Sequence, residues 1–436
     1  MDGLSGTWSP PHYDVSRPPG LDKVVALTSD PNFPQNFARI TKWSPDGSVY
    51  LSQCENRSFQ LGAFSSLDSS GSTSPSSPVT LEFCQSAPIV DFAWYPAATS
   101  SDPATFCFLA SVRECPVKLL DVSDGRLRAS YPIIDHRERF IAPHSLAFNL
   151  TAQKLYCGFE DAIEVFDVAT PGEGTRLATT PNKSSKDGLK GIISALAFCP
   201  SYESDMFAAG SLSANRANIA LFSESQGEAP LMFLDGGVQA GVMQLQFNPV
   251  QPHLLYASFR RDTRIFCWDI RYNSDQPLKI YAPTSDVPFS GVNTQIDYPS
   301  FKESTNQKHR FDIDISGKYL SVGRQDGNIL MYDLDDPLSL EVSEPQGDEI
   351  EPTIISPTLV FEAHDDSVGS VAFHPISARL LSSSGSRNFD EGSSDSEDSV
   401  SDSDDSLMGT TTSVLILGTI VEYRFMYSRS CNEETN

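Results

Sequence analysis

The chain has 436 residues, 39% of them hydrophobic, and its 57 acidic side chains against 31 basic ones give a net charge of −26. This hydrophobic fraction is enough to bury a sizeable core. The acidic total excludes binding to nucleic acid through a basic field of the whole protein, so any contact with phosphates needs a local basic patch.

The N-terminus and the cysteines predict a soluble protein in a reducing compartment. Residues 1–14 lack the basic start and apolar core of a secretory signal peptide. The nearest approach to a membrane span, Val414–Val421, is far shorter than the roughly 20 apolar residues required. None of the eight cysteines forms a CxxC pair, and we expect reduced, buried thiols in the cytosol or nucleus.

One unit recurs along the chain. It consists of an apolar strand that ends in an anchor residue, a polar turn and a second apolar strand, as at Thr41–Ser52 and Ser370–Ser384. The anchors are 49 to 66 residues apart, slightly more than the roughly 40–45 residues of a WD40 repeat, with the excess in loops. The seven anchors are Trp43, Trp94, Phe148, Phe198, Phe247, Ile313 and Phe373.

Two further positions agree with this repeat. A third strand often follows and ends in an apolar–aspartate step, where the carboxylate accepts hydrogen bonds from the adjoining turn. These aspartates are Asp121, Asp167, Asp269 and Asp333. His364 stands nine residues before Phe373, at the position of the repeat's Gly-His pair, and we expect it to bond within its own blade. The fourth unit departs from the pattern, because Ile219–Ser225 has serine at the aspartate position.

The repeats predict an all-β fold, a seven-bladed WD40 β-propeller with acidic disordered insertions in its last blades. Residues 1–20 are expected to form a flexible N-terminal segment and 21–436 the propeller, with Leu21–Leu27 completing the last blade. The blades are expected near residues 36–64, 88–133, 141–182, 191–236, 241–285, 307–340 and 358–425. The low-complexity or acidic insertions are 65–78, 335–355 and 388–406.

No arrangement of titratable residues predicts catalysis. The seven histidines show no metal-ligand spacing, and neither a phosphate-loop GK[ST] nor GxSxG is present. We expect a binding protein rather than an enzyme, with no cofactor, metal or small-molecule substrate. Local basic clusters exist despite the acidic total, and blade loops meeting on one face would pool their charges. They are Arg260, Arg261 and Arg264; Lys183, Lys186 and Lys190; and Lys308, His309 and Arg310.

Several longer stretches carry a family likeness. They are ASVRECPVKLLD (Ala110–Asp121), IAPHSLAFNLTAQKLYCGF (Ile141–Phe159), GIISALAF (Gly191–Phe198), FCWDIR (Phe266–Arg271) and TNQKHRFDID (Thr305–Asp314). In this order they resemble the telomerase Cajal body protein 1 family of WD40 proteins, in a fungal-type member. The resemblance covers about residues 37–389.

The resemblance implies a scaffold that binds small Cajal-body or nuclear RNA and directs ribonucleoproteins, telomerase among them, to their place of assembly. It implies ribonucleoprotein partners, no membrane, a monomer, and a location in the Cajal body or nucleoplasm. Unpaired loop bases suit protein readout, with Arg or Lys for phosphates and aromatic or Arg side chains for stacking. The RNA-binding candidates are Arg113, His144, Arg260, Arg261 and Lys308.

Two matters stay open at this point. A protein–protein adaptor in pre-mRNA splicing or small nuclear ribonucleoprotein biogenesis, without direct RNA contact, is the alternative function. The chain after Met408 also departs from the family's final strand. The β-branched stretch TSVLILGTIVEYRF supplies a candidate strand there, but closure of the ring at this seam is open.

Overall fold

The computed structural model describes residues 9–27, 30–63, 81–181, 187–215, 217–227, 229–272, 274–283, 306–335, 352–387 and 419–425. The predicted insertions 65–78 and 388–406, together with Lys183 and Lys186, lie outside these residues. Every regular element in the described part is a β-strand, and the strands form seven sheets. Among these residues no helix is long and apolar enough to cross a membrane.

The first three blades are antiparallel sheets of four strands taken in chain order. Blade one holds β2 (Ala38–Trp43), β3 (Tyr50–Cys54), β4 (Ser58–Gly62) and β5 (Leu81–Cys84). Blade two holds β6 (Ile89–Trp94), β7 (Cys107–Val112), β8 (Val117–Asp121) and β9 (Leu127–Tyr131). Blade three holds β10 (Ser145–Phe148), β11 (Lys154–Phe159), β12 (Ala162–Asp167) and β13 (Thr175–Ala178).

Blades four to six repeat this plan with one addition. Blade four holds β14 (Ile193–Phe198), β15 (Met206–Ser211), β16 (Ile219–Ser223) and β17 (Met232–Leu234). Blade five holds β18 (Val242–Phe247), β19 (Leu254–Phe259), β20 (Ile265–Asp269), β21 (Lys279–Tyr281) and a fifth strand, β25 (Thr353–Ile355). Blade six holds β22 (Phe311–Ile313), β23 (Tyr319–Gly323), β24 (Asn328–Asp333) and β26 (Leu359–Glu362).

Two expected boundaries are corrected here. Residues 353–355, expected within an exposed insertion, pair in parallel with β21 as β25. Residues 359–362, expected at the start of blade seven, pair with β24 and form the outer strand of blade six. Each segment pairs with a strand that lies more than 20 residues earlier in the sequence, so its pairing depends on the tertiary fold rather than on its own pattern.

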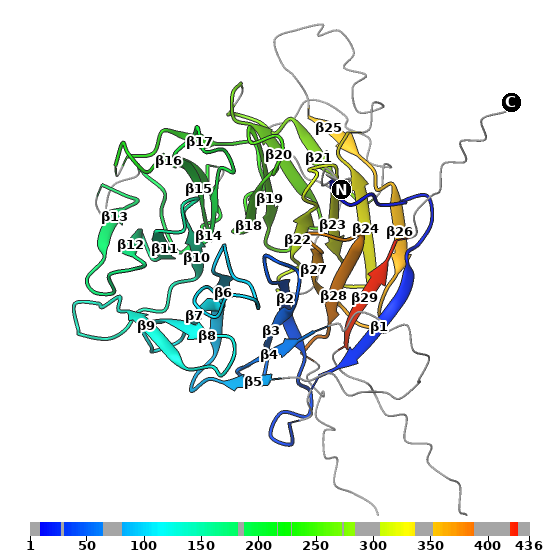
Figure 1. The fold of residues 1–436 in the computed structure, drawn as a ribbon. Coiled ribbons are helices and arrows are strands. Elements are labelled where there is room, and N and C mark those ends of the chain that lie inside the picture. The colour runs from blue at the N-terminus through cyan, green and yellow to red at the C-terminus, as the bar shows by residue number, and fades with distance from the viewer. Residues whose placement is uncertain are drawn as a thin grey trace, which may run out of the picture.

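Blade seven combines the two ends of the chain. It holds β27 (Val368–Phe373), β28 (Arg379–Ser384), β29 (Thr419–Arg424) and β1 (Gly20–Ala26). β1 runs antiparallel to β29, with Val24 opposite Val421, and Figure 1 shows the blue and red strands side by side. The stretch after Met408 therefore supplies the third strand, and the expected closing segment supplies the fourth.

The hydrophobic core is divided among the blade interfaces. In the described residues it forms seven clusters, and each cluster joins two neighbouring blades, including blades seven and one. Phe59 of blade one, for example, makes edge-to-face contacts with Phe92 and Phe108 of blade two. Each blade buries its two faces against its neighbours, which is why the ring must close.

The N-terminal segment also differs from what the sequence predicts. Residues 1–20 are expected to be flexible, but Tyr13 is fully buried between blades six and seven. Its ring contacts Tyr319, Phe373 and Phe425 edge-on, with centroid distances of 5.8, 5.0 and 5.1 Å. Tyr13 therefore anchors this segment in the core of the ring, while residues 16–18 beside it are exposed.

Candidate nucleic-acid interface

The strand directions divide the loops between two ends of the ring. Adjacent strands of a blade are antiparallel, so the blade-to-blade linkers and the turns between second and third strands lie at one end. We call this the linker end. The turns between first and second strands lie at the opposite end, where each anchor residue ends its first strand.

All five predicted RNA-binding residues lie at the linker end. Arg113 follows β7, while Arg260 and Arg261 follow β19, both between second and third strands. His144 and Lys308 precede the first strands of blades three and six. Residues nearly 200 positions apart in sequence thus share one face of the ring.

Three of the five meet above the central channel. Burial lowers the pKa of His144, and the charges of Lys308 and Arg113 lower it further. Burial likewise lowers the pKa of Lys308 to about 8, with a further contribution from Arg310. Asp91 opposes both shifts, but the carboxylate does not offset the surrounding positive charge.

The same place holds three arginines that the candidate set missed. Arg310 is partly buried, lines the channel and donates from Nη1 to the carbonyl of Met243 at 3.0 Å. Its pKa is lowered by burial and by the charge of Arg39, against the attraction of Asp91. In the sequence Arg310 belongs to the basic cluster with Lys308, and this cluster could have identified Arg310 as a candidate RNA-binding residue.

Arg39 and Arg387 belong to none of the basic clusters seen in the sequence. Arg39 occupies an irregularity of β2, between Ala38 and Ile40, where the strand register shifts. Arg387 follows β28, and its Nε donates to Glu55 Oε1 at 2.6 Å. Glu55 also faces Arg39 at 3.5 Å, so one carboxylate serves two guanidinium groups.

We call Arg39, Arg113, His144, Lys308, Arg310 and Arg387 the mouth cluster. It contains five cationic side chains and one histidine, and the carboxylates that act on them are Glu55 and Asp91. Positive charges from blades one, two, six and seven and the His144 ring of blade three therefore converge on the channel mouth. An excess of cations, of which Arg39, Lys308 and Arg310 are partly buried, favours an anionic ligand.

Arg260 and Arg261 lie beside the mouth cluster through a shared partner. Both donate from Nε to Oδ1 of Asn306, at 3.1 and 2.8 Å. Arg264, grouped with them in the sequence, is instead buried and paired with Asp262 at 2.9 Å. The Arg264 guanidinium also lies over the Phe266 ring, 5.2 Å from its centroid. This cation–π contact and the ion pair give Arg264 a structural role.

The channel below the mouth is a cavity of about 390 Å³. Its polar lining includes Lys42, whose Nζ donates to the carbonyl of Phe92 at 2.7 Å, and Asp312. Burial raises the pKa of Asp312 to about 6, against the hydrogen bonds that it accepts from Gln246 and the Phe373 amide. Within the described residues no group of three or more His, Cys, Asp or Glu is placed to hold a metal ion.

The predicted repeat residues occupy framework positions. His364 Nε2 lies 2.7 Å from Ser382 Oγ and Nδ1 lies 3.0 Å from Thr419 Oγ1, both in blade seven. The aspartates at the third-strand ends accept amide hydrogen bonds from the following turns, as Asp167 does from Ala169 and Thr170. Asp269 and Asp333 do the same for Arg271 and Asp335.

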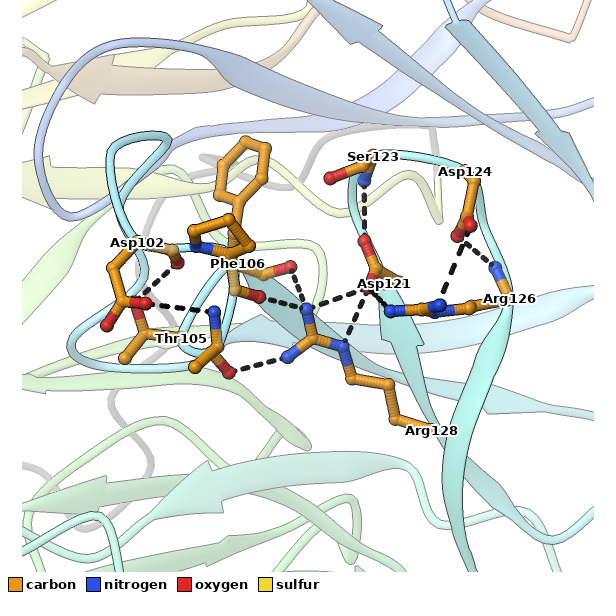
Figure 2. Close-up of polar contacts among 10 residues, drawn as sticks. Asp102, Thr105, Phe106, Asp121, Ser123, Asp124, Arg126 and Arg128 are labelled. Atoms are coloured by element: carbon orange, nitrogen blue, oxygen red, sulfur yellow. Dashed lines mark hydrogen bonds and ion pairs between the residues drawn. The ribbon is translucent and has the colours of Figure 1, made fainter.

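Asp121 forms the largest of these turn networks (Figure 2). Arg128 donates to its Oδ2 from Nε at 3.0 Å and from Nη2 at 2.8 Å. The same guanidinium donates to the carbonyls of Ala104 and Phe106, in the turn after β6. Arg126 approaches Asp121 from the solvent side at 3.2 Å.

Comparison with known proteins adds a repeat and a set of relatives. Residues 355–389 match the family described as WD domain, G-beta repeat. The chain is 30% identical over 360 residues to "Telomerase Cajal body protein 1" of Rattus norvegicus, covering 82% of this chain and 60% of that protein. The protein of the same name from Homo sapiens is 30% identical over 361 residues, covering 82% and 58%.

A third relative comes from a yeast. "Guanine nucleotide-binding protein negative regulator 1" of Schizosaccharomyces pombe is 28% identical over 314 residues, covering 70% of this chain and 72% of that protein. The chain spans about 60% of the length of the first two relatives. The seven sheets close into a ring, so the chain is a seven-bladed β-propeller that contains a WD repeat and is similar over 82% of its length to telomerase Cajal body protein 1.

Proposed function

We propose that this propeller is an RNA-binding scaffold that holds a small nuclear or Cajal-body RNA at its linker end. The observation that carries the proposal is the mouth cluster, in which five cations converge and Glu55 and Asp91 are the carboxylates that act on Arg39, Lys308, Arg310 and Arg387. Such a local excess meets the requirement that the acidic chain, at −26, sets for any contact with phosphates.

The chemistry of the cluster suits an unpaired RNA segment. Arg113 and Arg387 have planar guanidinium groups that match phosphate oxygens in pairs, and Lys308 supplies a point charge. His144, whose pKa is lowered, is neutral at physiological pH and offers a ring face on which an unpaired base stacks. Arg260 and Arg261, fixed by Asn306, extend the path of the backbone.

The relatives' name supplies the biological setting of the proposal. We infer a role in the nucleus, in the Cajal body or nucleoplasm, where the protein binds ribonucleoprotein components and takes part in their localisation or assembly. Telomerase is a candidate client because the relatives carry its name. The protein acts by binding, as a monomer, and not by catalysis.

The test is RNA binding by purified protein with matched variants. A fluorescent hairpin RNA with an unpaired loop is titrated with the wild-type protein, with Arg113→Ala/Lys308→Ala, and with Lys154→Ala/Lys318→Ala. The last pair removes two lysines beside first-to-second-strand turns, at the opposite end. We expect at least a tenfold loss for the first double variant and a change within twofold for the second.

The salt dependence supplies a second readout. Neutralising about five phosphates of a single strand gives a slope of log K against log salt of about −3 to −4. Equal losses in both double variants would contradict the assignment of the linker end. Absence of binding even at low salt would reject RNA contact and favour the protein–protein adaptor in splicing or ribonucleoprotein biogenesis.

A further inference from the structure

The opposite end of the ring carries exposed apolar residues on four consecutive blades. Blades four to seven each expose one large apolar side chain in the turn after the first strand. The exposed fractions are 83% for Tyr202, 60% for Val250, 42% for Ile315 and 54% for Ile376. The corresponding described turns of blades one to three contain no such residue. We call these four residues the apolar arc.

A cavity opens beside the apolar arc. It measures about 360 Å³ and lies between the first strands of the same four blades. Its lining is almost wholly apolar and includes Phe198, Phe247, Phe373 and Ile315, with Gln246 and His374 as its polar members. Exposed apolar surface grouped around a hollow marks a binding site more often than chance exposure does.

The backbone under the cavity is held rigidly. Asn248 Nδ2 donates to the carbonyl of Gly317 at 2.8 Å and joins the turns of blades five and six. His374 Nδ1 accepts from the amides of Ile376 and Ser377, at 3.0 and 3.1 Å, and fixes the turn of blade seven. A preformed surface loses little conformational entropy when a ligand binds.

The charge at this end is opposite to that of the mouth cluster. The first-to-second-strand turns hold four partly or fully exposed acids, and Lys318 is the cation among those same turns. The acids are Asp46, Asp102, Glu203 and Asp205. Hydrogen bonds from Ser225 and Ser223 lower the pKa of Asp205, so this carboxylate is ionised at neutral pH.

We propose that the opposite end docks a basic protein segment that inserts one large apolar side chain into the cavity between blades four and seven. Of the four acids, Glu203 and Asp205 lie in the turn of blade four, which borders the cavity. The acidic turns of this end favour lysine and arginine beside the apolar residue and disfavour RNA. The propeller then joins two ligands of opposite charge, a polyanion at the linker end and a basic protein segment at the other. This inference is independent of RNA binding at the mouth cluster.

The test uses a fluorescent peptide with three lysines or arginines on each side of a central phenylalanine. Its affinity for the full chain is measured by anisotropy, beside a peptide with serine at the centre and a peptide with glutamates as flanks. We expect the serine peptide to bind at least tenfold more weakly and the glutamate peptide not to bind. Equal affinities of the phenylalanine and serine peptides would reject insertion into the cavity.

Matched variants locate the site. Val250→Lys/Ile376→Lys places two charges in the apolar arc, and we expect at least a tenfold loss of affinity. Val24→Lys/Val360→Lys makes the same change at exposed positions of β1 and β26, and we expect no more than a twofold effect. Equal losses in the two double variants would overturn the proposal, because binding would then follow net charge alone.

A second copy of the chain is the competing occupant. Light scattering of the wild-type protein at rising concentration measures self-association. A dimer that Val250→Lys/Ile376→Lys abolishes would assign the apolar arc to self-association and overturn docking of a basic segment. A monomer that binds the phenylalanine peptide through the apolar arc supports the proposal.

Discussion

Single side chains at the strand ends differ in how much they are expected to contribute to the stability of the fold. Arg128 has 18% of its side chain exposed and ties Asp121 to three carbonyls of the turn after β6, whereas Arg126 is 70% exposed and pairs with the same carboxylate. Arg128→Ala leaves the buried carboxylate and the carbonyls without these donors, and we expect a loss of about 2–4 kcal/mol in the free energy of unfolding.

The neighbouring arginine provides the control for this prediction. An exposed ion pair is worth about 0–1 kcal/mol, so Arg126→Ala is expected to cost less than 1 kcal/mol. Chemical denaturation of both variants measures the difference. Equal losses would show that the carbonyl contacts of Arg128 do not stabilise blade two.

If RNA binds at the mouth cluster as proposed, Lys308 is expected to make its affinity depend on pH. Its pKa of about 8, caused first by burial and then by Arg310, means that the free protein loses this charge between pH 7 and 9. Phosphate binding favours the protonated amine, so affinity falls as pH rises, by at most about tenfold over this range. Titrations at constant salt measure it.

A matched variant identifies the titrating group. Lys308→Arg keeps the charge throughout this pH range, and its affinity is expected to vary less than twofold. An unchanged pH profile in Lys308→Arg would place the titration on another residue.

At the scale of elements, the ring is closed by three segments that are far apart in sequence. β1 pairs with β29, β29 pairs with β28, and Tyr13 packs where blade six meets blade seven. Their β-branched and alternating patterns predict strands for both β1 and β29, but neither pattern specifies a partner. The pairing is decided by β28, whose free edge accepts β29, and β29 in turn accepts β1.

Tyr13 tests whether this seam stabilises the whole ring. Its hydroxyl is buried and accepts or donates no hydrogen bond among the described residues. Tyr13→Phe is therefore expected to change the free energy of unfolding by less than about 1 kcal/mol, while Tyr13→Ala loses about 3–5 kcal/mol through the cavity it leaves. Thermal and urea unfolding compare the two variants. Similar stabilities for them would mean that the segment before β1 is not part of the core.

The molecule as a whole is expected to lose stability on mild acidification. Burial lowers the pKa values of His364 and His374 to about 4, with Arg379 adding to the shift of His374. A histidine whose folded pKa lies below its unfolded value of about 6.5 stabilises the fold fully above that pH, and this stability is lost as the pH falls towards 4. For His364 the loss is on the order of 3 kcal/mol.

Two carboxylates, Asp312 and Glu422, act in the opposite direction over part of this range, because burial raises the pKa of each. The pKa of Asp312 is raised to about 6 by burial, so its contribution is present at low pH and is lost as the pH rises through 6. His144, His364 and His374, all with lowered pKa values, outweigh these two carboxylates and leave a net loss on acidification. Urea unfolding between pH 7.5 and 4.5 measures it, and His364→Gln should give a shallower pH dependence. A stability that rises on acidification would contradict this account.

The sequence by itself determined the repeat, the number of blades and the all-β class, because alternation, anchors and strand-end aspartates are local patterns that any blade must contain. It also singled out Arg113, His144 and Lys308, through their positions in family-like stretches. Local sequence patterns did not predict the contacts between segments that are distant in the chain. It missed Arg39 and Arg387, the outer strand β26 and the buried Tyr13, since each depends on what lies across the ring.

Only the tertiary structure decided how charge is arranged. The composition describes an acidic chain, yet closure of the ring gathers the cations of four blades at one mouth and exposes apolar and acidic turns at the other end. The reason is geometric: antiparallel strands send alternate loops to opposite ends, and rotation of successive blades about the channel brings residues hundreds of positions apart within reach of one ligand.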